Sequence, residues 1–211
     1  CLLVLSSIGQ AQAATVLVVG DSISAAFGLE TQEGWVTLLE ERLLEHNPRF
    51  NVVNASISGE TTGGGLARFP QLLAEYQPDY VIIELGGNDG LRGLSLAQMS
   101  SNLTSMVQQA KQQDAVVLLL GMRLPGNYGQ RYTEAFYNVY QQIAEQENVA
   151  VVDFFLAGVG GEEGMMQADG GHPTQVAQPL LLANAWQRLA PLLPPAPAPS
   201  GQQHLPSIAP A

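Results

Sequence analysis

The chain has 211 residues, of which 46% are hydrophobic and 13% are charged, so it can bury the core of one domain and is not a disordered chain. Its 8 basic and 19 acidic residues give a net charge of −11, which argues against nucleic-acid binding and against electrostatic docking on an anionic membrane. A single cysteine excludes an internal disulfide framework and a multi-cysteine zinc site.

Residues 1–13 are typical of the end of a secretory signal peptide. A short apolar run at 2–8 precedes Ala11-Gln12-Ala13, which has small residues at the two positions that a signal peptidase reads. The run is too short to cross a membrane, so we expect no stable membrane insertion. A first buried strand is the alternative. We expect a longer precursor that is cleaved after Ala13, and a periplasmic or secreted protein.

From residue 15 onward, buried strands alternate with helices. Near-continuous apolar runs predict strands at 15–19, 51–54, 80–85, 115–120 and 149–154. Helical spacing of apolar residues predicts helices at 35–44, 65–76, 95–113, 131–147 and 174–189. This alternation predicts one three-layer α/β/α domain over residues 14–193, with a flavodoxin-like central parallel sheet of about five strands. Residues 194–211 are rich in proline and alanine, and we expect them to form a disordered tail.

Two polar blocks at the ends of predicted strands contain a candidate nucleophile and its base. Ser22 directly follows the first strand, and its hydroxyl needs a neighbouring base to become nucleophilic. His172 lies in a glycine-rich loop before the last predicted helix, and Asp169, three residues earlier, is placed to hold the imidazole ring. The alternatives are a helix N-cap at Ser22 and a plain glycine-rich turn at 169–172.

Two further residues suit an oxyanion hole. Gly59 follows the second strand and has no Cβ, so its backbone N–H can approach a reacting carbonyl closely. Asn88 follows the third strand, and its side-chain NH₂ can donate to an oxyanion without titrating. Each block can instead be a plain turn.

The four blocks, Gly20-Asp21-Ser22, the Gly59 block, Gly86-Gly87-Asn88-Asp89 and Asp169-Gly170-Gly171-His172, resemble those of the SGNH (GDSL-type) hydrolases. Residues 53–59, 84–93 and 123–129 are similar to the bacterial periplasmic thioesterase, protease and lysophospholipase subgroup and its related arylesterases. The resemblance runs from about residue 15 to residue 193.

The resemblance implies a catalytic set of five residues. Ser22 would be the nucleophile and an oxyanion donor, Gly59 and Asn88 the other donors, and Asp169 and His172 the rest of the triad. Gly171 departs from the subgroup, which usually has a larger apolar residue before the histidine, so the stiffness of this loop is in question.

The resemblance also implies a serine esterase that acts on small-molecule acyl esters and thioesters, including lysophospholipids, aryl esters and acyl-CoA, through an acyl-enzyme. No metal and no organic cofactor are needed. We expect an apolar segment after the fourth strand to line the acyl site: Met122, Leu124, Pro125 and Tyr128. The sequence assigns no oligomeric state.

Two alternatives remain at this point. One is an SGNH-type carbohydrate acetylesterase. The other is a flavodoxin-like non-enzymatic binding module in which Asp21 and Asp89 gather a metal or a phosphate, although no glycine-rich nucleotide-binding motif follows any predicted strand.

Overall fold

The computed structural model describes residues 13–196. The expected signal-peptide remnant and proline-rich tail therefore lie outside the described residues, except for Ala13 and residues 194–196.

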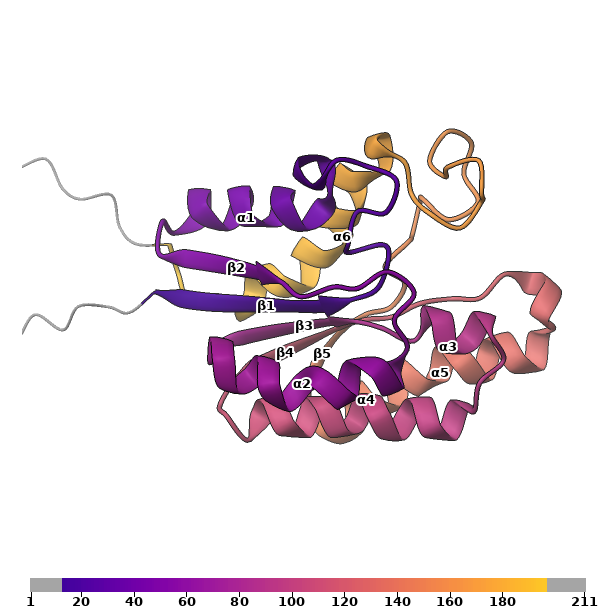
Figure 1. The fold of residues 1–211 in the computed structure, drawn as a ribbon, viewed down its shortest axis with the longest axis horizontal. Coiled ribbons are helices and arrows are strands. Elements are labelled where there is room, and N and C mark those ends of the chain that lie inside the picture. Colours follow the sequence, from indigo (N-terminus) through magenta and orange to yellow (C-terminus); the bar gives the residue numbers. More distant parts are fainter. Residues whose placement is uncertain (1–12, 197–211) are drawn as a thin grey trace, which may run out of the picture.

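A five-stranded parallel sheet forms the centre of the protein (Figure 1). Its strands are β1 (Ala14–Gly20), β2 (Phe50–Asn54), β3 (Tyr80–Glu84), β4 (Val116–Leu120) and β5 (Ala150–Val152). They are arranged in the order β2-β1-β3-β4-β5, which is the doubly wound order of flavodoxin-like proteins. The expected parallel sheet of about five strands is confirmed.

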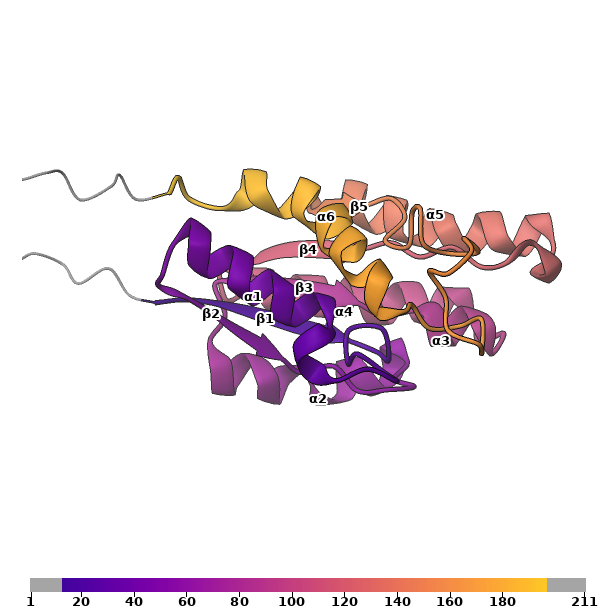
Figure 2. The ribbon, with the colours of Figure 1, turned by 90° about the horizontal axis from the view of Figure 1, so that it is seen from above.

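Helices cover both faces of this sheet (Figures 1 and 2). Helices α1 (Trp35–His46) and α6 (Gln178–Leu189) pack together on one face. Helices α2 (Thr62–Tyr76), α4 (Leu96–Lys111) and α5 (Gln130–Glu147) pack side by side on the other. The predicted three-layer α/β/α architecture is therefore confirmed.

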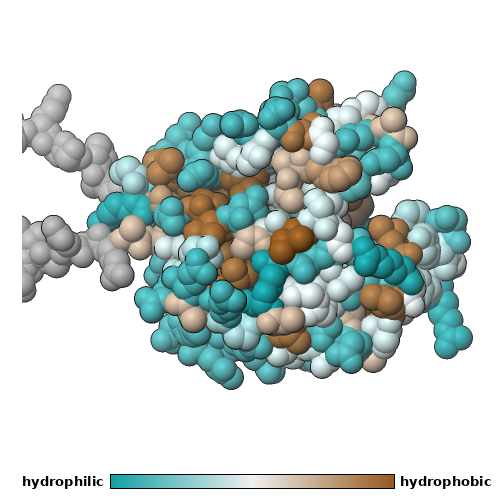
Figure 3. Space-filling view, viewed as in Figure 1, coloured by the Kyte–Doolittle hydropathy of each residue, from teal (hydrophilic) through white to brown (hydrophobic). Residues whose placement is uncertain are grey.

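Hydrophilic residues cover most of the visible surface, and hydrophobic residues form small separate patches on it (Figure 3). Among the helices of residues 13–196, none combines the length and the apolar character needed to cross a membrane.

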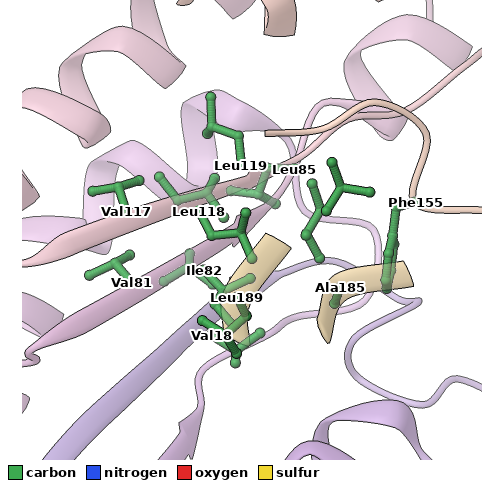
Figure 4. Packing of buried hydrophobic residues seen from close by; sticks show 14 of the residues in the cluster. Val18, Val81, Ile82, Leu85, Val117, Leu118, Leu119, Phe155, Ala185 and Leu189 are labelled. Atoms are coloured by element: carbon green, nitrogen blue, oxygen red, sulfur yellow. The ribbon is translucent and has the colours of Figure 1, made fainter. Parts of the chain in front are cut away.

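The core lies between the sheet and the two helix layers. Val18, Ile82 and Leu118 are cross-strand partners on β1, β3 and β4, and each is almost fully buried. Figure 4 shows Val18 and Ile82 beside Leu189 of α6. Because both faces of these central strands are covered, their sequences are continuous apolar runs.

Several elements differ from the predictions, and three of these differences lie at the carboxyl edge of the sheet or lead into the last helix. The short helix α3 (Gly87–Leu91), where the sequence suggested a turn, was not predicted. Strand β5 ends at Val152, two residues early, because it is an edge strand whose partner β4 ends at Leu120, opposite Val152. The last predicted helix begins as a 3₁₀ turn (Gln175–Ala177), and α6 follows it.

The carboxyl ends of the strands meet at one edge of the sheet, and both ends of the described chain lie at the opposite edge (Figure 1). The loops that follow β1, β2 and β3 therefore lie next to one another. All four polar blocks singled out in the sequence are at this carboxyl edge.

Candidate active site

Ser22 begins a turn directly after β1. A Cβ atom on Gly20 would lie 2.7 Å from the Ser24 side chain and 2.8 Å from the Glu84 carboxylate, so only glycine fits at the end of the strand. Beyond it the Ser22 carbonyl accepts a hydrogen bond from the Phe27 N–H at 3.0 Å. The chain thus turns sharply at the sheet edge and leaves Ser22 half-buried.

His172 connects Ser22 to Asp169, although 150 residues separate the serine from the histidine in the sequence. The His172 Nε2 atom lies 2.9 Å from Ser22 Oγ, and His172 Nδ1 lies 2.6 Å from Asp169 Oδ2. The imidazole can therefore accept the serine proton on one nitrogen while its other N–H donates to the carboxylate. The three residues are brought together as the sequence predicted.

Asp169 is held as a carboxylate by three donors. Its Oδ1 atom accepts the backbone N–H groups of Gly171 and His172, at 2.9 and 3.1 Å, and its Oδ2 atom faces the imidazole. These bonds, led by the one to His172, lower the pKa of Asp169 from its usual 3.8 to about 2. The residue is therefore ionised whenever His172 can act as a base.

Asn88 lies on α3, which follows β3 after a two-residue connection. Gly86 starts this helix with φ of +112°, a backbone conformation that favours glycine. The Asn88 Nδ2 atom donates to Asp21 Oδ2 at 3.0 Å, and Asp21 immediately precedes the candidate nucleophile. An amide NH₂ has two hydrogens, so the second remains to donate to an oxyanion beside Ser22.

Gly59 lies in a tight turn after β2. The Glu60 N–H donates to the Ile57 carbonyl at 3.1 Å, and Gly59 has φ of +78° at the third position, as a type II turn requires. Arg92 joins this turn to α3, because its Nη2 atom donates to the Gly59 carbonyl at 2.9 Å and to Asn88 Oδ1 at 3.4 Å. The guanidinium of Arg92 thus binds both Gly59 and Asn88, two of the predicted oxyanion donors.

A buried pair of acidic residues supports the oxyanion side. Glu84, fully buried at the end of β3, accepts the Asp21 N–H at 3.2 Å and the Ser24 hydroxyl at 2.8 Å on its Oε2 atom. Burial raises the pKa of Glu84 well above its usual 4.5, and the neighbouring Asp21 charge raises it further. Burial also raises the pKa of Asp21. Asp21 thus lies between Glu84 and Asn88, and it is the acceptor for the Asn88 amide.

Asp89 has a structural partner. Its two carboxylate oxygens accept the N–H and the hydroxyl of Thr62, at 2.8 and 2.5 Å, and so hold the first turn of α2. The binding-module alternative needs Asp21 and Asp89 as open ligands, whereas each accepts hydrogen bonds from protein donors. Within residues 13–196, no group of three or more His, Cys, Asp or Glu side chains is placed to hold a metal ion.

The predicted acyl-site segment divides into a buried half and an exposed half. Met122 and Leu124 are 5% and 9% exposed and belong to the core. Pro125 and Tyr128 are exposed, and the Tyr128 hydroxyl donates to the Leu91 carbonyl at 3.1 Å. A hollow of about 420 Å³ is lined by Tyr128 and the start of α5, and the triad residues do not border it. That these four residues line the acyl site stays a prediction.

Sequence reasoning did not identify two residues that lie behind the site: Glu84, and Arg92 in its bridging position between Gly59 and Asn88. Glu84 left a signal, because it is an acidic residue at the end of an otherwise apolar run. Arg92 is a polar residue in a loop, and its residue type alone does not indicate which groups it binds.

The chain is similar to known proteins over most of its length. Residues 18–178 match the GDSL-like Lipase/Acylhydrolase family. Esterase TesA of Pseudomonas aeruginosa is 60% identical over 193 residues, which are 92% of this chain and 96% of that protein. Thioesterase 1/protease 1/lysophospholipase L1 of Escherichia coli K12 is 42% identical over 191 residues, 90% of each chain.

The fold also matches solved structures. A crystal structure of TesA superposes with a TM-score of 0.83 and 62% sequence identity, covering 85% of this chain and 99% of that one. Family and fold therefore agree: the chain belongs to the GDSL-like lipase/acylhydrolase family, that of the SGNH hydrolases, and it is a carboxylic ester hydrolase.

Proposed function

We propose that the chain hydrolyses acyl esters and thioesters with Ser22 as nucleophile and His172 as general base. As Ser22 Oγ attacks the acyl carbonyl carbon, its proton passes to His172 Nε2, and the ionised Asp169 stabilises the resulting imidazolium. The carbonyl oxygen becomes an oxyanion that accepts hydrogen bonds from the Ser22 N–H, the Gly59 N–H and the Asn88 side chain. The observation that carries this proposal is the unbroken Ser22–His172–Asp169 hydrogen-bond chain.

Collapse of the tetrahedral intermediate breaks the bond between the acyl carbon and the leaving oxygen or sulfur. His172 gives its proton to that leaving group, and an alcohol or a thiol departs while the acyl group remains on Ser22. Water then attacks the acyl-enzyme, with His172 taking one of its protons. A second collapse returns that proton to Ser22 Oγ and releases the carboxylic acid.

The proposed substrates are neutral and zwitterionic acyl esters, including aryl esters and lysophospholipids, together with acyl thioesters. The similarity to the E. coli protein, whose name includes thioesterase and lysophospholipase activities, supports this range. The same triad chemistry applies to all of them, because each presents an acyl carbonyl with an oxygen or sulfur leaving group.

We also propose a periplasmic or secreted location. The support is the sequence pattern of residues 1–13, an apolar run followed by Ala11-Gln12-Ala13. Fractionation of cells that express the full precursor, with sequencing of the mature N-terminus, tests this. Cleavage after Ala13 and recovery in the periplasm or medium are expected, whereas an uncleaved cytosolic protein would contradict the proposal.

Steady-state kinetics on p-nitrophenyl acyl esters of graded chain length, beside an acetylated sugar, tests the proposed activity. We expect the acyl esters to be cleaved in preference to the sugar, no effect of EDTA, and loss of turnover in Ser22→Ala with the fold retained. Preferred release of acetate from the sugar would identify a carbohydrate acetylesterase instead. Loss of activity with EDTA, and its recovery with a divalent ion, would contradict the metal-free mechanism.

A further inference from the structure

His172 and Asp169 lie at the tip of a small hairpin in a glycine-rich loop. Residues 158–171 contain six glycines, at 158, 160, 161, 164, 170 and 171, so the chain there has much conformational freedom to lose. A single antiparallel bridge between Met166 and Pro173 forms the stem, together with a bond from the Thr174 N–H to the Met165 carbonyl at 2.8 Å. A stem this short orders the tip but does not fix its distance from Ser22.

Gln167 makes hydrogen bonds both within this hairpin and across to the turn at residues 22–28, called here the Ser22 turn. Its backbone N–H donates to the His172 carbonyl at 2.7 Å, and its carbonyl accepts the Gly170 N–H at 2.9 Å. Its side-chain Nε2 donates to the Pro173 carbonyl at 3.0 Å and to the Phe27 carbonyl at 2.8 Å. The last bond joins two loops that are 140 residues apart in the sequence.

The Ser22 turn is shaped to receive this side chain. Gly28 has φ of +78°, and a Cβ atom on it would collide with Gln167 Oε1. The Phe27 ring lies 4.4 Å from the His172 ring, centroid to centroid, so the histidine packs against the same turn that Gln167 binds. Phe27 itself belongs to that turn, since its N–H donates to the Ser22 carbonyl at 3.0 Å.

We propose that Gln167 is a positioning residue that fixes the Asp169–His172 hairpin against the Ser22 turn and thereby sets the distance over which His172 takes the serine proton. The proposal rests on the roles proposed for Ser22 and His172. It also explains how a loop with Gly171 before its histidine stays in place. Gly171 has no side chain that could hold the loop, and the hydrogen bonds of the Gln167 amide hold it instead.

Substituting Gln167 by methionine tests this with little change in volume, because Gln167→Met keeps the side-chain length and removes the amide. We expect kcat on a p-nitrophenyl ester to fall about ten-fold, since small displacements of reacting groups are costly, with KM unchanged. The rate of labelling by a fluorophosphonate should fall in parallel. Gln108→Met is the matched control, because Gln108 also donates from its amide, to Glu147 at 2.7 Å, but lies on α4.

Two further measurements separate positioning from loss of structure. The low-field proton resonance of the Nδ1–H of His172 reports its bond to Asp169, which lies within the hairpin, so it should persist in Gln167→Met with an unchanged Tm. Gly171→Ala should restore part of the lost kcat, because a Cβ there meets only Asp169 Oδ1, at 3.9 Å, and reduces the freedom of the loop.

The outcomes are distinct. Unchanged kcat and labelling rate in Gln167→Met would overturn the proposal, and so would loss of the low-field resonance with a lower Tm, which would show a purely structural role. Activity retained in Ser22→Ala would instead overturn the proposed function. If Ser22→Ala is inactive and Gln167→Met is fully active, the proposed triad stands and only the positioning role of Gln167 is rejected.

Discussion

Asp169 acts on Ser22 entirely through one imidazole. It binds Nδ1 of His172 and two backbone N–H groups of its own turn, so it sets both the tautomer and the orientation of the ring. Its pKa of about 2 keeps Asp169 ionised at pH values well above 2, so protonation of this carboxylate should not limit activity there.

Asp169→Asn should lower kcat about 10⁴-fold, as the same change does in serine proteases, because the amide favours the wrong imidazole tautomer. Steady-state kinetics on an aryl ester measures this. Asp114→Asn, an exposed change between α4 and β4, is the matched control and should leave kcat unaltered. A loss that appears only in KM would argue against the assigned role.

In the proposed mechanism, Asn88 differs from the triad because it stabilises mainly the charge that develops on the substrate oxygen. Asn88→Ala should therefore lower kcat about 100- to 1,000-fold while KM changes little. Asn138→Ala on the exposed side of α5 serves as control. If KM alone rose, Asn88 would be a substrate-binding residue and the oxyanion hole would need another donor.

Among the secondary-structure elements, β3 has the least expected feature, a fully buried glutamic acid at its carboxyl end. Because the pKa of Glu84 is raised in the folded state, the folded protein keeps a proton that the unfolded chain has lost above about pH 4.5. The free energy of unfolding therefore falls as pH rises from about 4.5 toward the folded pKa, and the contribution of Glu84 is fully present only below that range.

Glu84→Gln should remove this part of the pH dependence. The amide oxygen can still accept the Asp21 N–H and the Ser24 hydroxyl, and it cannot ionise. We expect the variant to gain stability relative to the parent by about 1.4 kcal/mol per pH unit above pH 4.5, up to the folded pKa. Urea unfolding across pH measures this, with the exposed Glu163→Gln as control. A constant difference at all pH values would show that Glu84 is ionised in the folded protein.

The sequence was most informative where apolar periodicity is long. The five strands and the helices around them were predicted within a few residues, because buried strands and amphipathic helices each impose a repeat. Helix α3 was missed because its five residues, Gly87–Leu91, include two glycines and are too few to show a period. It forms where the Gly86 turn and the bonds of Asp89 to Thr62 hold it.

The sequence predicted which side chains meet at the candidate site, but not the residues that hold them there. Ser22, Asn88 and His172 belong to short motifs beside predicted strands or helices, so residue type and position were enough to select them. Arg92 donates to the backbone carbonyl of Gly59, and Gln167 donates to that of Phe27. Both partners lie in loops that are distant in the sequence, so these hydrogen bonds become apparent only in the folded structure. The acyl-site segment was read from its apolar character alone, which does not separate core residues such as Met122 from exposed ones.

The whole molecule has a net charge of −11, which affects its binding of charged substrates. Of the arginines near the loops, Arg68 is paired with Glu60 and Arg123 is stacked on the Tyr137 ring at 4.1 Å. Arg92 is bonded to Gly59 and Asn88. These three arginines thus already have partners within the protein, and the long-range field repels a polyanion.

Acyl-CoA should therefore be cleaved with a high KM that falls as added salt screens the repulsion. A neutral aryl ester and a zwitterionic lysophospholipid should show little salt dependence, and they provide the controls. Initial rates on all three substrates at low and moderate salt give the comparison. A KM for acyl-CoA that rises with salt would mean that the arginines form a phosphate site.

Peptide mass spectrometry that locates the covalent adduct of a fluorophosphonate tests whether Ser22 is the nucleophile. The geometry predicts one adduct, on Ser22, because His172 Nε2 lies 2.9 Å from Ser22 Oγ and can take its proton. It also predicts no adduct in Ser22→Ala. An adduct on any other residue of the parent protein would contradict the assignment.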